Sequence, residues 1–213
     1  MTNFVVDTFT ETSDTVLTSH TGETGASWTL HPSYSVDNQS VIGADDNLGY
    51  NAVGSGSTAY YASGTPDTAE YDVTGDFVYT GGISGSSSKR LCGRIDTANN
   101  TMYYGGVTAS SPYWILGKIV SGSFTTLDSD TTAFTANVTV KLEIRDASKK
   151  LYLDGVEVCT TADNEITAAG KAGIRFYANS DDFRLDNFIA VNAGGGGISI
   201  PVATNHIIKQ LNG

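Results

Sequence analysis

Apolar and polar side chains alternate most regularly over residues 138–158, VTVKLEIRDASKKLYLDGVEV, and this pattern predicts two linked β-hairpins. Every second residue of 138–144 is apolar, which is the period of a strand with one buried face. A turn at 146–148 then reverses the chain into a second alternating stretch at 150–153. This is the strongest strand signal in the chain.

The second hairpin has a turn that also predicts its register. Asp154-Gly155 fits a two-residue turn of type I′, because both positions tolerate a positive φ. Such a turn pairs Leu153 with Val156 and Leu151 with Val158. All four side chains are apolar, so the turn chemistry and the hydrophobic pattern agree.

Strand-like segments recur roughly every ten residues with turn signals between them, which is typical of a β-sandwich. No window shows sustained helical periodicity, and 213 residues fit one large β-domain, which we place at residues 1–192. The other predicted strands are Phe4–Phe9, Trp28–Leu30, Val41-Ile42, Thr58–Ala62, Ala69–Tyr79, Leu91–Thr97, Met102–Val107, Tyr113–Val120, Ser123–Leu127, Ala172–Ala178 and Phe183–Val191.

The last predicted strand contains an irregularity. Phe183 and Leu185 share a parity that Phe188 breaks, so a regular strand cannot turn all three towards one core. We therefore expect a β-bulge at Asp186-Asn187, where one extra residue re-aims the side chains.

The C-terminal end has a different composition. Residues 193–197, AGGGG, are typical of a linker, and residues 198–213 are too few to build a core, so we interpret them as an extended arm. The arm either docks on another subunit by adding a strand to a sheet edge or packs back on its own domain. The apolar side chains that would carry subunit docking are Ile198, Ile200, Val202, Ile207, Ile208 and Leu211.

The chain carries a formal net charge of −11, from 23 acidic and 12 basic side chains. Such a charge repels phosphate backbones and argues against nucleic-acid binding. No apolar run approaches the ~20 residues of a membrane helix, so no membrane partner is expected. The N-terminus shows no signal-peptide pattern, which indicates synthesis in a cytoplasm; extracellular action would then require release by another route, such as virion assembly and lysis.

The two cysteines, Cys92 and Cys159, have no metal-type spacing and are too few for a disulfide framework. Strand parity places both on the face opposite their apolar neighbours. We expect two free thiols.

Two blocks of sequence carry a family resemblance. They are DTFT at 7–10 with Thr15, Leu17, His20-Thr21 and Trp28, and KKLYLDGV at 149–156 with GIRFY at 173–177 and LDNF at 185–188. Over residues 4–191 the chain resembles the concanavalin A-like lectin and laminin-G-like jelly rolls, particularly those of bacteriophage virion and tail proteins. The resemblance implies an all-β, antiparallel two-sheet jelly-roll sandwich with its first and last strands close together. Because this fold hosts lectins, glycanases and structural modules, the function has to come from the site.

Three pairs of adjacent aromatic residues are candidates for sugar binding, which normally uses an aromatic platform beside amide and carboxylate groups. On a strand, one member of each pair faces away from the core. An outward tyrosine is also ordinary in sheets, but three pairs together favour a recognition face. The pairs are Tyr60-Tyr61, Tyr103-Tyr104 and Tyr113-Trp114, and the candidate carbohydrate-binding residues are Tyr61, Tyr104, Tyr113 and Trp114.

A structural Ca²⁺ site is another candidate, because this ion takes roughly six to eight oxygen ligands from carboxylates, amides and carbonyls. Asp7 on the first strand could converge with Asp186 and Asn187 at the expected bulge if those strands are neighbours. Asp181-Asp182 and Asp45-Asp46 are alternatives. Asp and Asn are also common turn formers, in which case no cofactor is bound.

A catalytic site is incomplete in this sequence. The glycanases of the family that this chain resembles carry a strand motif, Glu-x-Asp-x-(x)-Glu. Glu70-Tyr71-Asp72 matches the first half of this motif, but Thr74 or Gly75 occupies the position of the second glutamate. Retaining hydrolysis needs that second carboxyl group about 5–5.5 Å from the first. We therefore read the two carboxylates as solvent-facing strand residues. The histidines, expected in exposed loops or the tail, are His20, His31 and His206.

These observations favour a non-enzymatic virion component, either a structural or decoration protein or a tail-associated one. It would dock on other virion subunits as a homo-oligomer and contact a host surface glycan through its lectin-like face. A free carbohydrate-binding lectin, with or without Ca²⁺, is the alternative. A glycoside hydrolase of the same fold is the third hypothesis.

Overall fold

The computed structural model describes residues 2–35, 40–43, 47–51, 56–79, 87–111, 113–177 and 183–194. Its strands are β1 (Asn3–Asp7), β2 (Thr15–Val16), β3 (Trp28–Leu30), β4 (Ser40–Gly43), β5 (Asn47–Asn51), β6 (Ser57–Ala62), β7 (Tyr71–Tyr79), β8 (Ser88–Asp96), β9 (Thr101–Thr108), β10 (Trp114–Val120), β11 (Ser123–Asp130), β12 (Val138–Ile144), β13 (Lys149–Leu153), β14 (Val156–Thr161), β15 (Lys171–Tyr177) and β16 (Phe183–Asn192). A short 3₁₀ turn, η1 (Leu17–Ser19), follows β2.

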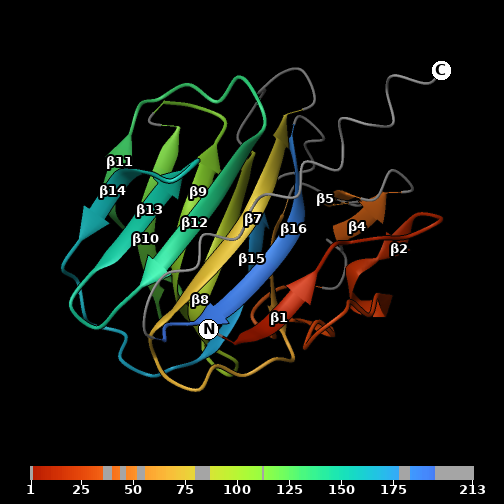
Figure 1. Ribbon diagram of the computed structural model, residues 1–213, viewed down its shortest axis with the longest axis horizontal. Coiled ribbons are helices and arrows are strands. Elements are labelled where there is room, and N and C mark those ends of the chain that lie inside the picture. The colour runs from red at the N-terminus through yellow and green to blue at the C-terminus, as the bar shows by residue number, and fades with distance from the viewer. Residues whose placement is uncertain are drawn as a thin grey trace.

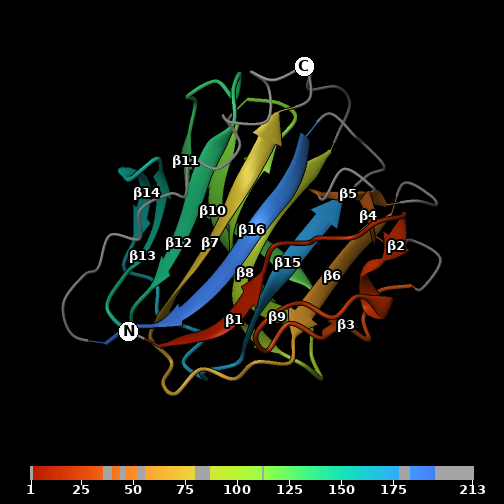
Figure 2. The same ribbon diagram turned by 45° about the vertical axis from the view of Figure 1, so that its right-hand side comes forward.

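The strands form two antiparallel sheets packed face to face (Figures 1 and 2). The nine-stranded sheet has the order β14-β13-β12-β7-β16-β5-β4-β2, with β1 also paired to β16, and lies in front in Figure 1. The seven-stranded sheet behind it has the order β11-β10-β9-β8-β15-β6-β3. The predicted all-β jelly-roll sandwich is confirmed, and so is the expected closeness of its first and last strands, β1 and β16.

One hydrophobic core fills the space between the two sheets. Alternation along β12 places Val140, Leu142 and Ile144 in it, as the sequence predicts. Leu91 and Ile174 enter from the seven-stranded sheet. Apolar area removed from water in this way contributes about 25 cal/mol per Å², so the core supplies the main driving force for folding.

The β13–β14 hairpin has the predicted turn. Asp154 has a φ of 48° and Gly155 a φ of 84°, and two positive φ values define the type I′ geometry. Leu153 pairs with Val156, as expected for a two-residue loop.

Farther from the turn, the predicted register is wrong by one residue. Leu151 pairs with Cys159 instead of Val158, because β14 contains a bulge. The extra residue reverses the parity of the strand beyond it, so Cys159 lies in the core between the sheets. The expectation that this cysteine faces away from the core is therefore wrong, while both thiols are free as predicted.

The bulge predicted in the last strand is confirmed. Asp186 pairs with Asp76, but Ile189 pairs with Thr74, so β16 gains one residue between the two pairs. Asn187 in this interval has a φ of 50°. The bulge lets residues of both parities, Leu185 and Phe188, enter the same core.

Asp7 at the end of β1 links the two sheets at one edge. Its buried carboxylate accepts hydrogen bonds through Oδ1 from the Phe9 amide (2.7 Å) and His20 Nε2 (2.9 Å), and through Oδ2 from Trp28 Nε1 (2.5 Å). Trp28 belongs to β3 of the seven-stranded sheet, whereas β1 belongs to the nine-stranded sheet. A buried carboxylate is tolerated only with such partners, so these bonds fix the relative position of three segments.

His20 lies between two carboxylates. Its Nε2 faces Asp7 Oδ1, and its Nδ1 lies 2.7 Å from Glu11 Oε1; only the imidazolium carries a hydrogen on both nitrogens. Burial alone would lower the pKa of His20, but the hydrogen bonds and charges of the two carboxylates raise it above its usual value. Burial raises the pKa of Asp7, against the opposing effect of its hydrogen bonds. His20 is buried, so the expected exposed loop position is wrong.

Several predictions fall outside the described residues. They concern Asp45-Asp46, Asp181-Asp182, most of the glycine linker, and the arm 198–213 with His206 and the docking residues Ile198, Ile200, Val202, Ile207, Ile208 and Leu211. In the described part of the chain, no helix is long and apolar enough to cross a membrane.

The raised pKa of His20 predicts a pH-dependent stability. A pKa raised by folding adds stability that is complete below the unfolded-state value of 6.5 and is lost as the pH rises through the folded-state value. The raised pKa of Asp7 acts in the same direction at lower pH. We expect the free energy of unfolding, measured by urea denaturation, to fall with rising pH above 6.5 more steeply in the wild type than in His20→Gln. Equal slopes in His20→Gln and the wild type would contradict this prediction.

Burial also predicts that both thiols are inert. It raises the pKa of Cys92 and of Cys159 to about 12, and for Cys92 it outweighs the opposing charges of Arg175 and Arg90. Because the thiolate is the reactive form, we expect no reaction with a disulfide reagent in the native protein at pH ~8. In denaturant both thiols should react. Rapid labelling of either thiol in the folded protein would rule out the burial that we describe.

Candidate functional site

The outer face of the seven-stranded sheet, turned away from the other sheet, carries a second hydrophobic cluster. Its buried members are Ala59, Cys92, Ile95, Met102, Tyr104 and Ile119, with Tyr34, Tyr61 and Ile115 packed against them. Alternation separates Tyr61 from Tyr60, which lies in the core between the sheets, and Tyr104 from the buried Tyr103. The predicted outward placement of Tyr61 and Tyr104 is thus confirmed, and sugar contact by either residue stays a prediction.

The third aromatic pair is not on this face. Trp114 is 1% exposed, and its ring centroid lies 6.2 Å from that of Phe77 and 5.5 Å from that of Phe134. It pairs with Val107, whose side chain also enters the core, so the inward parity of β10 begins with Trp114. Tyr113 precedes the strand and packs against the same core. Trp114 as a sugar-binding residue is therefore wrong, and Tyr113 does not join the outer-face cluster.

The predicted calcium ligands do not converge. Both oxygens of Asp7 already accept N–H donors, as described above. Asp186 Oδ1 accepts the Asn187 amide at 2.7 Å, and Asn187 Nδ2 donates to Asp76 Oδ2 at 2.9 Å. Within the described ranges, no three His, Cys, Asp or Glu side chains are placed to hold a metal ion. The site composed of Asp7, Asp186 and Asn187 is wrong because these residues stabilise a strand end and a bulge instead.

The remaining candidate catalytic residues have structural contacts. Glu70 Oε1 accepts the Asp146 amide at 3.0 Å, and Asp72 forms an ion pair with Arg145 at 2.8 Å. His31 is fully buried, so the expected exposed position is wrong. Its Nε2 donates a hydrogen bond to the carbonyl oxygen of residue 96 at 2.8 Å, because a carbonyl oxygen can only accept. These side chains hold strands and turns together.

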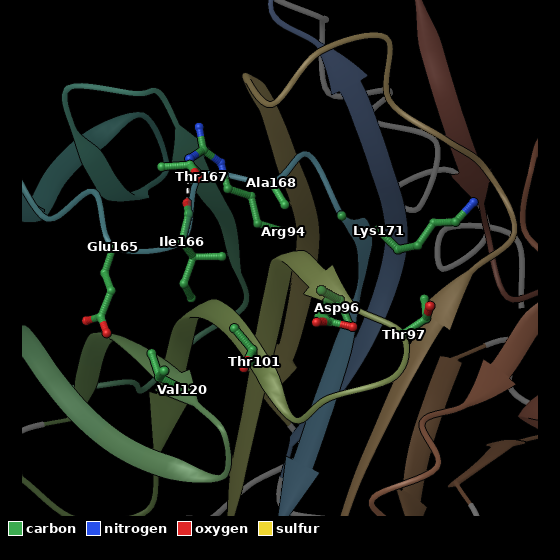
Figure 3. Close-up of a pocket in the computed structure, with 12 residues that line it drawn as sticks. Arg94, Asp96, Thr97, Thr101, Val120, Glu165, Ile166, Thr167, Ala168 and Lys171 are labelled. Atoms are coloured by element: carbon green, nitrogen blue, oxygen red, sulfur yellow. Dashed lines mark hydrogen bonds between the residues drawn. The ribbon is translucent and has the colours of Figure 1, made fainter.

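An open hollow of about 580 Å³ lies at one end of the sandwich, where β8 and β9 meet the segment 163–170 (Figure 3). Its cationic groups are already engaged. Arg94 donates to the Ile166 carbonyl at 2.6 Å and to Asp146 Oδ1 at 2.7 Å, and Lys171 donates to two backbone carbonyls. The charges of this hollow therefore hold a loop in place.

A different set of groups gathers on the outer face of the seven-stranded sheet. We call Tyr34, Arg90, Tyr104, Phe124 and Arg175 the aromatic–arginine cluster. Arg90 Cζ lies 4.4 Å from the ring centroid of Tyr104, and Arg175 Cζ lies 4.7 Å from that of Phe124 and 5.9 Å from that of Tyr34. These distances are within the range of cation–π attraction.

The Phe124 side chain extends from the edge strand β11 over the outer face, towards Arg175 of β15. It belongs to β11 at the sheet edge, and three strands, spaced about 4.8 Å apart, separate β11 from the β15 strand of Arg175. The ring is nevertheless 51% exposed. Tyr104 reaches over β10 because Gly117 leaves room: a Cβ on Gly117 would stand 2.5 Å from the tyrosine ring.

The cluster offers apolar rings and fixed hydrogen-bond donors side by side. Arg175 donates through Nη2 to Ser57 Oγ (2.8 Å) and through Nε to Tyr34 Oη (3.4 Å). Burial lowers the pKa of Arg90, but an arginine stays charged at neutral pH. Burial raises the pKa of the Tyr104 phenol, which stays protonated. Such a surface can bind a ligand that has both an apolar face and oxygen acceptors.

Sequence reasoning missed four members of the cluster. Arg175 stands between Ile174 and Phe176, and Arg90 precedes Leu91, so alternation alone would turn both arginines away from the core. Phe124 and Tyr34 gave no comparable signal. Their positions depend on how distant strands pair, which the parity of one strand does not contain.

Comparison with known proteins supports the fold and does not assign the chain to a family. No family model matches the sequence, and no curated protein matches it. Among solved structures, the CBM2 module of the evolved Dit of Lactobacillus casei BL23 phage J-1 is similar, with a TM-score of 0.57 and 10% identity over 88% of this chain and 94% of that one.

Two further structures show the range of proteins that share this architecture. Carbohydrate binding module CBM66 from Bacillus subtilis gives a TM-score of 0.54 and 15% identity, over 75% of this chain and 91% of that one. The Crh5 transglycosylase gives a TM-score of 0.53 and 9% identity, over 91% of this chain and 89% of that one. At these identities the likeness concerns the fold, and the chain has the concanavalin A-like jelly-roll fold.

Proposed function

We propose that this chain is a carbohydrate-binding domain whose binding surface is the outer face of the seven-stranded sheet. The observation that carries the proposal is the aromatic–arginine cluster. It combines Phe124, which is 51% exposed, with two arginines whose positions are fixed by their neighbours. The fold is one that a solved carbohydrate binding module also has, which makes the proposal consistent with the architecture.

The chemistry of a sugar suits this surface. One face of a pyranose ring presents C–H groups, which lie well against an aromatic ring, while its hydroxyl oxygens accept hydrogen bonds from N–H donors. Phe124 and Tyr177, which is 39% exposed, are two large hydrophobic side chains that the fold leaves in contact with solvent. Tyr177 belongs to β15 and has the same parity as Arg175, so it lies on the same face. Ligand sites commonly combine such rings with a few fixed polar groups.

We further propose that the domain binds glycans without cleaving them. Hydrolysis of a glycosidic bond normally needs two carboxyl groups that flank the bond. The cluster is composed of aromatic and cationic side chains. Glu70 and Asp72, which match half of a glycanase motif, are engaged with Asp146 and Arg145 on the other sheet.

A location in a virion, with a host surface glycan as ligand, is our more specific proposal. The similarity to a phage Dit module over most of both chains favours it. In that setting the C-terminal arm would dock on other virion subunits or on a second copy of this chain. The free lectin would need no such docking, so the two versions differ in what the arm does.

The binding surface can be tested with a glycan array. Phe124→Ala is expected to lower glycan affinity by about fivefold to tenfold, because an aromatic contact of this kind contributes about 1 to 1.4 kcal/mol. The exposed ring adds little to the core, so the melting temperature should change little. The matched control is Val156→Ala, which removes an exposed apolar side chain from the other sheet and should leave binding intact. Full binding by Phe124→Ala would place the ligand elsewhere.

The virion version can be tested by measuring mass in solution. The full chain is expected to form an oligomer, and a chain ending at Asn192 is expected to be a folded monomer, because the described strands end there. Light scattering gives the mass, and circular dichroism reports the fold. If both forms are monomeric, the arm does not mediate self-assembly.

A further inference from the structure

The two arginines of the cluster face each other across neighbouring strands. Arg90 of β8 and Arg175 of β15 are direct partners in the antiparallel register, and both project from the outer face. Like charges placed opposite one another destabilise a sheet. The fold nevertheless holds the two charges together, with each guanidinium packed on an aromatic ring of the cluster.

Elsewhere in the described chain, several basic side chains form ion pairs with carboxylates. The ion pairs are Arg94 with Asp146, Lys118 with Asp163 and Glu165, Lys141 with Glu143, Arg145 with Asp72 and Glu143, and Lys150 with Glu157. Carboxylates are also abundant, since the sequence has 23 acidic and 12 basic side chains. Within the residues that the structure describes, neither Arg90 nor Arg175 forms such a pair, so two adjacent guanidinium groups without a carboxylate partner lie on an acidic protein.

Among the described residues, the donor groups of the pair have no carboxylate acceptor, and one of them has no acceptor at all. Arg175 donates to two neutral hydroxyl groups, those of Ser57 and Tyr34. Arg90 Nε is buried and has no hydrogen-bond partner in the described part of the chain, although the guanidinium is held in place against the Tyr104 ring. A buried donor without an acceptor costs free energy, and an incoming acceptor would remove that cost.

We infer that the Arg90–Arg175 pair receives one anionic group of the glycan, either the carboxylate of an acidic sugar or a sulfate or phosphate ester. This inference rests on the proposed function and names the ligand class of the same site. A guanidinium group can donate two parallel charge-assisted hydrogen bonds to two oxygens of a carboxylate, sulfate or phosphate group, and the adjacent Phe124 ring supports the sugar itself.

The overall charge limits the ligand to few negative groups. A net charge of −11 repels a polyanion such as a nucleic acid over its whole length. A single carboxylate or ester on an otherwise neutral sugar meets only the local field of the two arginines. The site thus selects a glycan that carries one negative group on otherwise neutral sugars.

The experiment compares matched pairs of glycans with and without the charge: uronic acids against their parent hexoses, and sulfated and phosphorylated sugars against the unmodified ones. We expect the acidic member of one pair to bind on the order of tenfold tighter or more, since hydrogen bonds to charged groups reach that contribution. The pair that shows the preference identifies the carboxylate or the ester as the source of the charge. Added NaCl should reduce this preference in the wild-type protein, which tests the inference without any substitution.

Variants locate the preference on the sheet. Arg90→Gln and Arg175→Gln should each lower the affinity for the acidic glycan more than the affinity for its neutral counterpart, so that the preference, which is the ratio of the two affinities, is lost. Arg145→Gln makes the same change of charge on the other sheet and should keep the preference.

The outcomes separate the inference from the proposed function. Equal binding of acidic and neutral glycans, or a preference that survives both cluster substitutions, overturns the anionic ligand and leaves carbohydrate binding standing. Absence of binding to every glycan overturns both. Tighter binding of a single-stranded oligonucleotide than of any acidic glycan also overturns the inference.

Discussion

The buried carboxylate of Asp7 is the constraint on which the joining of the two sheets depends. It accepts hydrogen bonds from a residue just past β1, from the His20 segment and from Trp28 of β3, so one anion fixes three segments that belong to different parts of the fold. The Trp28 ring then packs against Phe188 of β16 at a centroid distance of 5.1 Å. A polar centre thereby orients the apolar core around it, because a buried carboxylate that lost these donors would be costly.

The sequence was sufficient where local rules decide the structure. Alternation predicted β12, and Asp154-Gly155 predicted the geometry of the turn between β13 and β14, because positive φ values restrict the choice of residues. The conflict between Leu185 and Phe188 predicted a bulge, since two parities in one core require an extra residue. These features follow from a few neighbouring residues, so no knowledge of the rest of the fold was needed.

The candidate site could not be predicted in the same way. Trp114 and Tyr113 resembled Tyr103 and Tyr104 in sequence, yet the tryptophan faces inward, because the first residue of β10 happens to have the inward parity. Arg90 and Arg175 become neighbours only when β8 pairs with β15. Alternation can say that a side chain leaves the core, but which residues it meets on the surface is a property of the strand order.

The bulge in β14 shows that the number of residues in a strand, as well as their identity, determines which side chains are buried. One residue added or removed between the turn and Cys159 would exchange the buried and exposed side chains of the whole outer part of that strand. The same change in the segment 162–170, which contains no strand, would disturb loop contacts such as that of Arg94 with the Ile166 carbonyl but would leave the parity of the strands unchanged. Chains that descend from this one can therefore vary in length through that segment, while within β14 an insertion must be matched by a second change that restores the parity.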